Sequence, residues 1–396
     1  MSLAHGRDLL AIPGPSVVPD RVLRAMHRAS PNIYEGELIE LTASVMADLR
    51  RVAGTAGPVA IYIGNGHAGW EAAAANLLAP GDRALALATG RFAEGWAATA
   101  RRLGAEVEVM DFGFRAPADP ARLEARLRAD REGAIRAVMV CQTDTASSVM
   151  NDLAGLRAAI DAAGHPALLM VDAIACLGCD PLAMDALGID LVVAASQKGL
   201  MTPPGLAFTW ASAKALAARV DARSAYWDWG PRHDPEAYYQ LFCGTAPTHH
   251  LYGLRAALDM ILAEGLAAVW ARHRALAGAV WAAVEAWGGP LALNMAQAAD
   301  RSAAVTTIRT APGEADRLRA WTRAEAGLTL GVGLCGPGED ASALFRIGHM
   351  GHLDPPMLLG ALATIEAGLL ACGIAHAPGG TAAAARAIAM AAPAQP

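Results

Sequence analysis

Asp190-Leu-Val-Val-Ala-Ala-Ser-Gln-Lys-Gly-Leu200 joins a short apolar run to a polar turn, and this stretch restricts the fold that the chain can adopt. The run from Leu191 to Ala195 predicts a buried β-strand. Gly199 and the stretch Pro203-Pro-Gly205 predict an open turn directly after it. The strand therefore delivers Lys198 to the edge of a sheet.

The amine of Lys198 differs chemically from almost every other positive charge in the chain. There are 32 lysine and arginine residues, of which only Lys198 and Lys214 are lysines. An arginine keeps its proton near neutral pH, whereas a lysine can lose it, and only a neutral amine attacks a carbonyl carbon. Lys214 follows Ala211-Ser-Ala213 in a helical pattern and is predicted to be an ordinary surface lysine. Lys198 is interpreted as a Schiff-base lysine.

Length and composition set the class of protein. A chain of 396 residues predicts two or three domains, and a hydrophobic content of 54% allows a large core. The net charge of −6 gives no general attraction to nucleic acid or to anionic membranes. No uninterrupted apolar stretch is long enough to span a membrane, and residues 1–7 lack an apolar signal core. We therefore expect a cytoplasmic protein.

The cysteines and histidines do not predict a metal site. Cys141, Cys176 and Cys179 lie in or beside apolar strand-like runs, so they are expected to be reduced thiols. Cys176 and Cys179 have the spacing of a redox or zinc-binding pair, but the sequence contains no second pair that would complete a zinc site. His349-Met-Gly-His352 likewise has no partner cluster nearby. We expect no metal.

Strand and helix patterns alternate between residues 59 and 210. This alternation predicts an α/β fold, with a mostly parallel sheet covered by helices on both faces. The predicted strands are Val59–Ile63, Arg83–Ala88, Glu106–Met110, Ala137–Cys141, Ala167–Val171, Leu191–Ala195 and Leu206–Trp210.

The pattern divides the chain into three parts. Residues 1–18 are predicted to be an N-terminal arm, 19–268 a large domain and 269–396 a smaller α+β domain with strands at 303–309 and 344–347. Between residues 221 and 248 an aromatic loop interrupts the large domain. A loop of that length is usually functional, or it covers a partner subunit.

Ligands of open α/β sheets collect outside the carboxyl ends of the strands, where a glycine-rich turn is predicted. Gly64-Asn-Gly-His-Ala-Gly69 lies between a strand and a helix, so its backbone N–H groups could bind an anion, with Asn65 and His67 as further donors. The turn matches neither GxxxxGK[ST] nor GxGxxG. An ordinary tight turn is the alternative.

Four further side chains have a chemical and a structural interpretation. Asp172 ends an apolar strand, and its carboxylate could simply cap the next segment. Beside a Schiff-base lysine it has a second possible role, since a carboxylate keeps the nitrogen of a pyridine cofactor protonated and the ring then withdraws electrons. Phe92 could stack on a flat ring, and Ser147 could donate a hydrogen bond, although such residues more often pack and cap. Arg346, in an apolar strand pattern, either pairs with a buried acid or holds a substrate carboxylate with its guanidinium fork.

Taken together, these motifs resemble the class V aminotransferases, which belong to the fold-type I pyridoxal-phosphate enzymes. The likeness is nearest to the alanine–, serine– and aspartate–glyoxylate aminotransferases and covers nearly the whole chain. Its most specific parts are Gly66-His67 with Trp70-Glu-Ala72, Val171-Asp-Ala173, Gly188-Ile-Asp190 and Ser196-Gln-Lys198 with Pro203-Pro-Gly205.

The resemblance implies a seven-stranded-type sheet in the large domain, pyridoxal 5'-phosphate as cofactor and a homodimer with shared active sites. It implies that Lys198 forms the Schiff base with the cofactor, that Asp172 pairs with the pyridine nitrogen, and that Arg346 binds the substrate carboxylate. The other implied contacts are also to the cofactor. The phosphate would be bound by Asn65, Gly66, His67 and Gln197. Phe92 would stack on the ring, Ser147 would contact the cofactor, and Thr245 would contact the phosphate in the site of the neighbouring subunit.

Some positions depart from the family pattern. Asn65 stands where the family often has serine, and Phe242 stands where a tyrosine often contacts the phosphate across the dimer. The loop at residues 32–36 differs from the usual glyoxylate-enzyme pattern, which leaves the amino donor open.

The predicted function is a ping-pong aminotransferase that moves the amino group of a small amino acid (alanine, serine or aspartate type) to glyoxylate or pyruvate. The alternatives are a pyridoxamine–pyruvate or ureidoglycine–glyoxylate type aminotransferase, a lyase or desulfurase, and a cofactor-binding regulatory protein without turnover.

Overall fold

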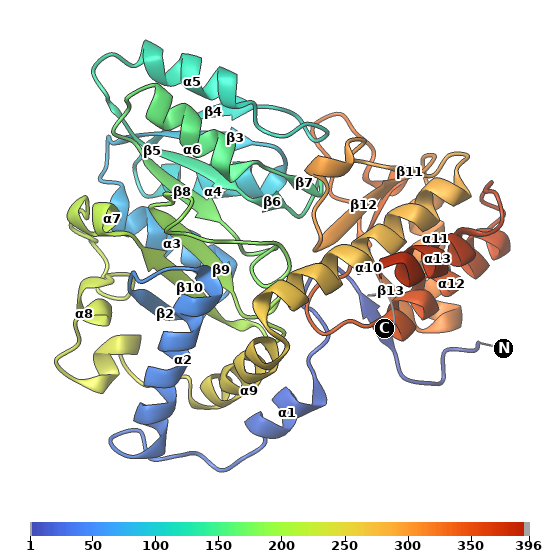
Figure 1. The fold of residues 1–396 in the computed structure, drawn as a ribbon, viewed down its shortest axis with the longest axis horizontal. Coiled ribbons are helices and arrows are strands. Elements are labelled where there is room, and N and C mark those ends of the chain that lie inside the picture. The colour runs from blue at the N-terminus through green and yellow to red at the C-terminus, as the bar shows by residue number, and fades with distance from the viewer. Residues whose placement is uncertain (1, 392–396) are drawn as a thin grey trace.

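The computed structural model describes residues 2–391 and contains two main sheets, each covered by helices (Figure 1). A seven-stranded sheet has the order β2-β10-β9-β8-β5-β3-β4, and a five-stranded sheet has the order β1-β13-β14-β12-β11. A hairpin of β6 and β7 stands apart from both. This architecture is the predicted α/β class.

The seven-stranded sheet contains the strands that the sequence predicts. Parallel pairing joins β3 to β4 and β5, β5 to β8, and β8 to β9, whereas β10 pairs antiparallel with both β9 and β2. The strands are β2 (Val59–Gly64), β3 (Arg83–Ala88), β4 (Glu106–Asp111), β5 (Ile135–Cys141), β8 (Leu168–Asp172), β9 (Leu191–Ala195) and β10 (Gly205–Ala211). The hairpin strands are β6 (Thr143–Asp144) and β7 (Val149–Met150).

Successive side chains of the strands point to opposite faces of the sheet, and each face has its own core. On β3, Leu85 and Leu87 join one apolar cluster, whereas Ala84 and Ala86 join the other. Each fully buried leucine stabilises the fold by about 1.5–3 kcal/mol. Small alanines on the second face leave room for the large rings of Trp70 and Trp96.

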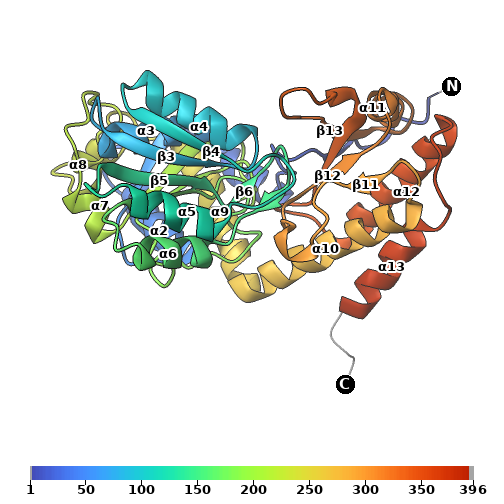
Figure 2. The ribbon, with the colours of Figure 1, turned by 90° about the horizontal axis from the view of Figure 1, so that it is seen from above.

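The helices of the large domain lie on both faces of this sheet. Figure 2 shows α3 and α4 on one side, and α2, α5 and α6 on the other. The helices of this part are α1 (Asp20–Met26), α2 (Glu37–Ala53), α3 (Gly66–Leu77), α4 (Arg91–Arg102), α5 (Pro120–Ala129), α6 (Leu153–Ala162), α7 (Ala213–Ala217), α8 (Gly230–His233) and α9 (Thr248–Glu264). The predicted aromatic loop therefore contains a short helix, α8, and a 3-10 turn at Tyr238–Phe242.

The smaller lobe is built on the five-stranded sheet. Its strands are β1 (Leu9–Ala11), β11 (Ala292–Leu293), β12 (Val305–Arg309), β13 (Leu328–Val332) and β14 (Leu344–Gly348), and its helices are α10 (Leu266–Trp287), α11 (Glu314–Ala326), α12 (Pro355–Ala371) and α13 (Gly380–Ala391). Strand β1 of the N-terminal arm pairs in parallel with β13. The long helix α10 runs from the large lobe into the small one (Figures 1 and 2).

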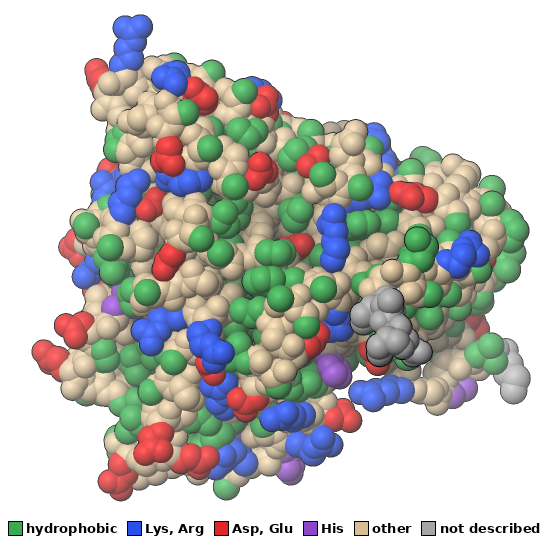
Figure 3. All heavy atoms as spheres, viewed as in Figure 1, with side chains coloured by type: hydrophobic (Ala, Val, Ile, Leu, Met, Phe, Trp, Pro, Cys, Tyr) green, Lys and Arg blue, Asp and Glu red, His purple; other side chains and the backbone are tan. Residues whose placement is uncertain are grey.

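The surface carries charges of both signs. In Figure 3, basic and acidic side chains are interspersed over the visible face, with apolar side chains between them. Within residues 2–391, no helix combines the length and the apolar character needed to cross a bilayer.

Candidate active site

Lys198 lies in the turn after β9, against the N-terminal arm. Its amine donates a hydrogen bond to the carbonyl of Pro13, and its own carbonyl accepts one from the Ser16 hydroxyl at 2.8 Å. Burial, together with the nearby charge of Arg346, lowers the pKa of the Lys198 amine to about 8. A substantial fraction of this amine is therefore neutral near physiological pH, as a nucleophile or a base requires.

The close approach of the arm to this lysine requires a glycine. Gly14 has a φ of +97°, and a Cβ added to it would lie 2.5 Å from the Lys198 amine. Any larger residue would be strained and would occupy the space of the amine. The arm therefore forms part of the site.

Asp172 ends β8, and its carboxylate faces the same cavity. One carboxylate oxygen, Oδ1, accepts a hydrogen bond from the backbone N–H of Ile174 at 2.6 Å, and the other, Oδ2, accepts one from the indole of Trp70 at 2.8 Å. Burial raises the pKa of Asp172 to about 6, and these two donors oppose that rise. Asp172 is therefore ionised at neutral pH although it is only 4% exposed.

The glycine-rich turn between β2 and α3 forms a third side of the site. The Asn65 side chain caps α3 by accepting a hydrogen bond from the His67 backbone N–H at 3.1 Å. A Cβ on Gly66 would lie 2.4 Å from Ile174, so the turn packs tightly on the segment after β8. Burial and the charge of Lys198 lower the pKa of His67, which keeps its imidazole neutral at physiological pH.

These elements enclose a cavity of about 200 Å³. Most of the predicted cofactor residues line it, together with residues that the sequence analysis does not single out. The lining residues are Asn65, Gly66, His67, Trp70, Phe92, Thr143, Thr145, Asp172, Ile174, Ala175, Gln197 and Lys198. A lysine, an acid and a helix-initiating turn thus converge from strands far apart in sequence.

Ser147 does not line this cavity. Its hydroxyl donates to the Asp144 carbonyl at 3.4 Å and accepts a hydrogen bond from the Val149 backbone N–H at 3.2 Å, so it belongs to the β6–β7 turn. Thr143 and Thr145, two residues apart on the same segment, line the cavity instead. The only sequence signal for them is their place directly after β5.

Arg346 also lies outside the lining of the cavity, at the centre of β14. Its guanidinium donates to the Val332 carbonyl at 2.8 Å and to the Thr145 carbonyl at 2.9 Å. Burial lowers its pKa to about 10. No carboxylate of residues 2–391 forms an ion pair with it, so the predicted alternative of a buried acid partner is not what holds this charge.

Thr245 is exposed and does not line the cavity of its own chain. Its predicted contact is to the site of a neighbouring subunit, so it stays a prediction. Phe242, three residues earlier, is buried in the large core at 1% exposure.

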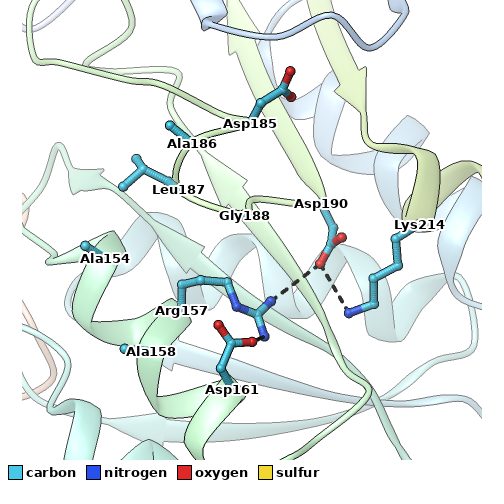
Figure 4. A pocket seen from close by; sticks show the side chains of 10 residues that line it. All are labelled: Ala154, Arg157, Ala158, Asp161, Asp185, Ala186, Leu187, Gly188, Asp190 and Lys214. Atoms are coloured by element: carbon cyan, nitrogen blue, oxygen red, sulfur yellow. Dashed lines mark hydrogen bonds and ion pairs between the residues drawn. The ribbon is translucent and has the colours of Figure 1, made fainter.

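The other lysine lies in a different hollow, which Figure 4 shows in close view. This open cavity of about 580 Å³ lies near the amino end of β9, whereas Lys198 follows its carboxyl end. Asp190 forms ion pairs with Lys214 at 3.6 Å and with Arg157 at 3.7 Å, and Arg157 also pairs with Asp161 at 2.6 Å. Lys214 therefore lies on the surface in an ion-paired cluster.

The cysteines and histidines with metal-like spacing have other surroundings. Within the described residues, no three His, Cys, Asp or Glu side chains are grouped to hold a metal ion. Burial raises the pKa of Cys176 and Cys179, so both are thiols. His349 forms hydrogen bonds with the Ala303 carbonyl and the Thr306 hydroxyl, each at 2.8 Å.

Comparison with known proteins identifies the family. A family model described as aminotransferase class-V matches residues 14–333. The serine–glyoxylate aminotransferase of Methylorubrum extorquens is 38% identical over 96% of this chain and 95% of its own. The L-aspartate–glyoxylate aminotransferase of Paracoccus denitrificans is 36% identical over 90% of this chain and 89% of its own.

A solved structure shares the whole fold. The pyridoxamine–pyruvate aminotransferase of Mesorhizobium loti superposes with a TM-score of 0.88 at 30% identity, covering 99% of this chain and 100% of that one. The resemblance and the fold-type I architecture predicted from the sequence are confirmed. This chain therefore belongs to the aminotransferase class-V family and is an aminotransferase.

Proposed function

We propose that this aminotransferase uses pyridoxal 5'-phosphate to move the amino group of a small amino acid, with serine first among the candidates, to glyoxylate. The observation that carries the proposal is the placement of Lys198, Asp172 and the glycine-rich turn around one cavity. The 38% identity to a serine–glyoxylate aminotransferase supports the choice of substrates. Alanine, aspartate and pyruvate are the competing substrates.

The residues of the cavity fit this cofactor. Gln197 Oε1 and Thr143 Oγ1 are buried and have no hydrogen-bond partner among the described residues, which is costly unless a ligand supplies one. The amine of Lys198 can attach to the aldehyde, and Asp172 can pair with the ring nitrogen. Phe92 can cover the ring. The phosphate, which accepts hydrogen bonds, can be held by N–H groups of Asn65, Gly66, His67 and Gln197.

When bound, pyridoxal 5'-phosphate withdraws electrons from the carbon that carries the amino group. The chain provides the proton transfer and the electrostatics. Lys198, with a pKa near 8, can take a proton from that carbon and return it. Asp172, with a pKa near 6, supplies a negative charge at neutral pH.

Arg346 is proposed to bind the substrate carboxylate. Two backbone carbonyls fix its guanidinium, and no carboxylate of the described residues neutralises it. A planar fork held in this way suits a carboxylate, which it binds with two hydrogen bonds. Serine, alanine, aspartate, glyoxylate and pyruvate all carry this group.

We also propose that the protein is a cytoplasmic homodimer in which Thr245 of one subunit completes the phosphate site of the other. Its exposure and its absence from its own cavity support this. The six cysteines are free, which fits a reducing compartment.

A pyridoxamine–pyruvate aminotransferase is the second candidate, because a protein of that name shares the fold at 30% identity. That reaction takes an aminated pyridine without phosphate as its donor. The glycine-rich turn at residues 64–69, which is proposed to bind a phosphate, weighs against it here. No cysteine lines the cavity, so the desulfurase alternative has no nucleophile in place.

A half-reaction screen tests the proposed function. Protein loaded with pyridoxal 5'-phosphate is mixed in turn with serine, alanine, aspartate and pyridoxamine, and the loss of the visible cofactor absorbance is followed. Glyoxylate or pyruvate is then added to restore it. Serine with glyoxylate should react fastest. A protein that reacts with none of the amino acids would overturn the proposal.

Arg346→Gln should raise the KM for the amino acid roughly 10- to 100-fold, because hydrogen bonds to a charged group contribute about 1.5–3 kcal/mol each. The measurement is steady-state KM and kcat with the best donor from the screen. A small amine without a carboxylate should react equally with both proteins. Arg309→Gln is the matched control, since Arg309 on the neighbouring β12 pairs with Glu339 at 2.9 Å. Equal KM values in wild type and Arg346→Gln would contradict the assignment.

A further inference from the structure

Trp70 touches the acid of the site through a direct hydrogen bond. It lies on α3, is 1% exposed and lines the cavity. Its indole nitrogen donates to Asp172 Oδ2 at 2.8 Å, across two elements that are far apart in sequence. An indole N–H can only donate, so this contact favours the ionised carboxylate.

The same ring contacts two other residues of the cavity. The His67 ring lies 4.4 Å from it between centroids, and the Phe92 ring lies 6.3 Å away in an edge-on arrangement. Thus the Trp70 indole lies against His67 of the glycine-rich turn, the proposed ring-stacking residue Phe92 and the acid Asp172. Trp96 stacks on the same ring, with centroids 6.4 Å apart and the ring planes 17° from parallel.

The surroundings of Asp172 explain why this donor matters. Burial opposes the charge of the carboxylate, and so does the nearby Asp144. Lys198 is the cation that faces it. The hydrogen bonds that favour the ionised form come from the Ile174 backbone, the Trp70 indole and, more weakly, the Cys141 thiol at 3.6 Å. Of these, the indole is the strongest side-chain donor.

We infer that Trp70 is a positioning residue for this reaction: its indole N–H keeps Asp172 ionised and holds Oδ2 in place. The inference rests on the proposed function, in which Asp172 pairs with the ring nitrogen of pyridoxal 5'-phosphate. A carboxylate that loses this donor gains a proton more easily and can turn about its last bond. The cofactor ring nitrogen would then lose its charged partner over part of the neutral pH range.

The test compares Trp70→Phe with Trp96→Phe. Both changes replace a buried indole on the same face of the sheet, but Trp96 donates to the Trp70 backbone carbonyl at 3.4 Å and does not touch Asp172. The first readout is the pKa of Asp172 in cofactor-free protein, followed by carboxyl carbon NMR. Trp70→Phe should raise it by about one unit, since a hydrogen bond to a charged group contributes about 1.5 kcal/mol or more.

The second readout is the steady-state reaction. Trp70→Phe should lower kcat roughly 10-fold at pH 7 with little change in KM, and should move the acidic limb of the kcat profile upward. Trp96→Phe should leave kcat at pH 7 and the acidic limb of the kcat profile unchanged. An Asp172 pKa that is the same in wild type and Trp70→Phe, or that shifts equally in both variants, would overturn the inference.

Wild-type protein supplies a reading if Trp70→Phe does not fold. In tryptophan-labelled cofactor-free protein, the indole N–H signal of Trp70 should titrate with the Asp172 pKa of about 6. If the chemical shift of the Trp70 indole N–H does not change with pH around this pKa, the inference is also overturned. The two NMR measurements need no cofactor. Failure of the proposed function appears separately, as a cofactor-loaded wild-type protein that no amino acid converts.

Discussion

Lys198→Ala should abolish turnover, with a loss of kcat of at least roughly 10⁴-fold, the upper range for a general base. The reason is that this amine is proposed both to attach the cofactor and to move the proton. Its pKa of about 8 leaves a substantial neutral fraction at physiological pH. The measurement is steady-state transamination with the best donor from the half-reaction screen.

The only other lysine is the control. Lys214→Ala removes an amine that is 47% exposed, pairs with Asp190 at 3.6 Å and lies in a different hollow from the Lys198 cavity. Its turnover should equal that of wild type. Borohydride reduction of cofactor-loaded wild-type protein should place a pyridoxyl group at residue 198 by mass analysis. Adduct at Lys214, or retained turnover in Lys198→Ala, would refute the assignment.

Asp172→Asn should lower kcat roughly 10²- to 10³-fold, the range seen when a preorganised electrostatic partner is removed. Asparagine has nearly the same shape and can still accept the hydrogen bond from Trp70, but it carries no charge. The loss should therefore appear in kcat and not in protein stability. The measurement is kcat at pH 7 to 8, where the wild-type carboxylate is ionised, since its pKa is about 6.

Asp180→Asn is the matched control for this change. Asp180 is also 4% exposed with a pKa raised to about 6 by burial, but it accepts hydrogen bonds from Ser302 and Ala303 between the two lobes. It should lower thermal stability and leave kcat nearly unchanged. If both substitutions reduce kcat equally, Asp172 has no special role and its effect is only structural.

Much of the fold could be predicted from sequence because it depends on short-range pattern. The run from Leu191 to Ala195 is apolar and bounded by turn residues, and it forms β9 with the same limits. A helix follows β2 as predicted, but it begins at Gly66, within the glycine-rich turn, and not near Trp70, because the Asn65 side chain caps it. Strand β13 was not predicted, because Leu328-Thr-Leu-Gly-Val332 is short and carries a glycine that accommodates Pro13 of the arm.

The sequence by itself determined the chemistry of the site, since the residue types that react or ionise are visible in it: Lys198, Asp172 and Arg346. The tertiary structure alone decided which neighbours modify that chemistry. In the folded chain, the Lys198 amine donates a hydrogen bond to the Pro13 carbonyl, the Trp70 indole donates one to Asp172, and Arg346 donates one to the Thr145 carbonyl. The tertiary structure also places Thr143 and Thr145, and not Ser147, in the cavity. Hydrophobic periodicity repeats over a few residues, whereas these contacts join segments that only the folded sheet brings together.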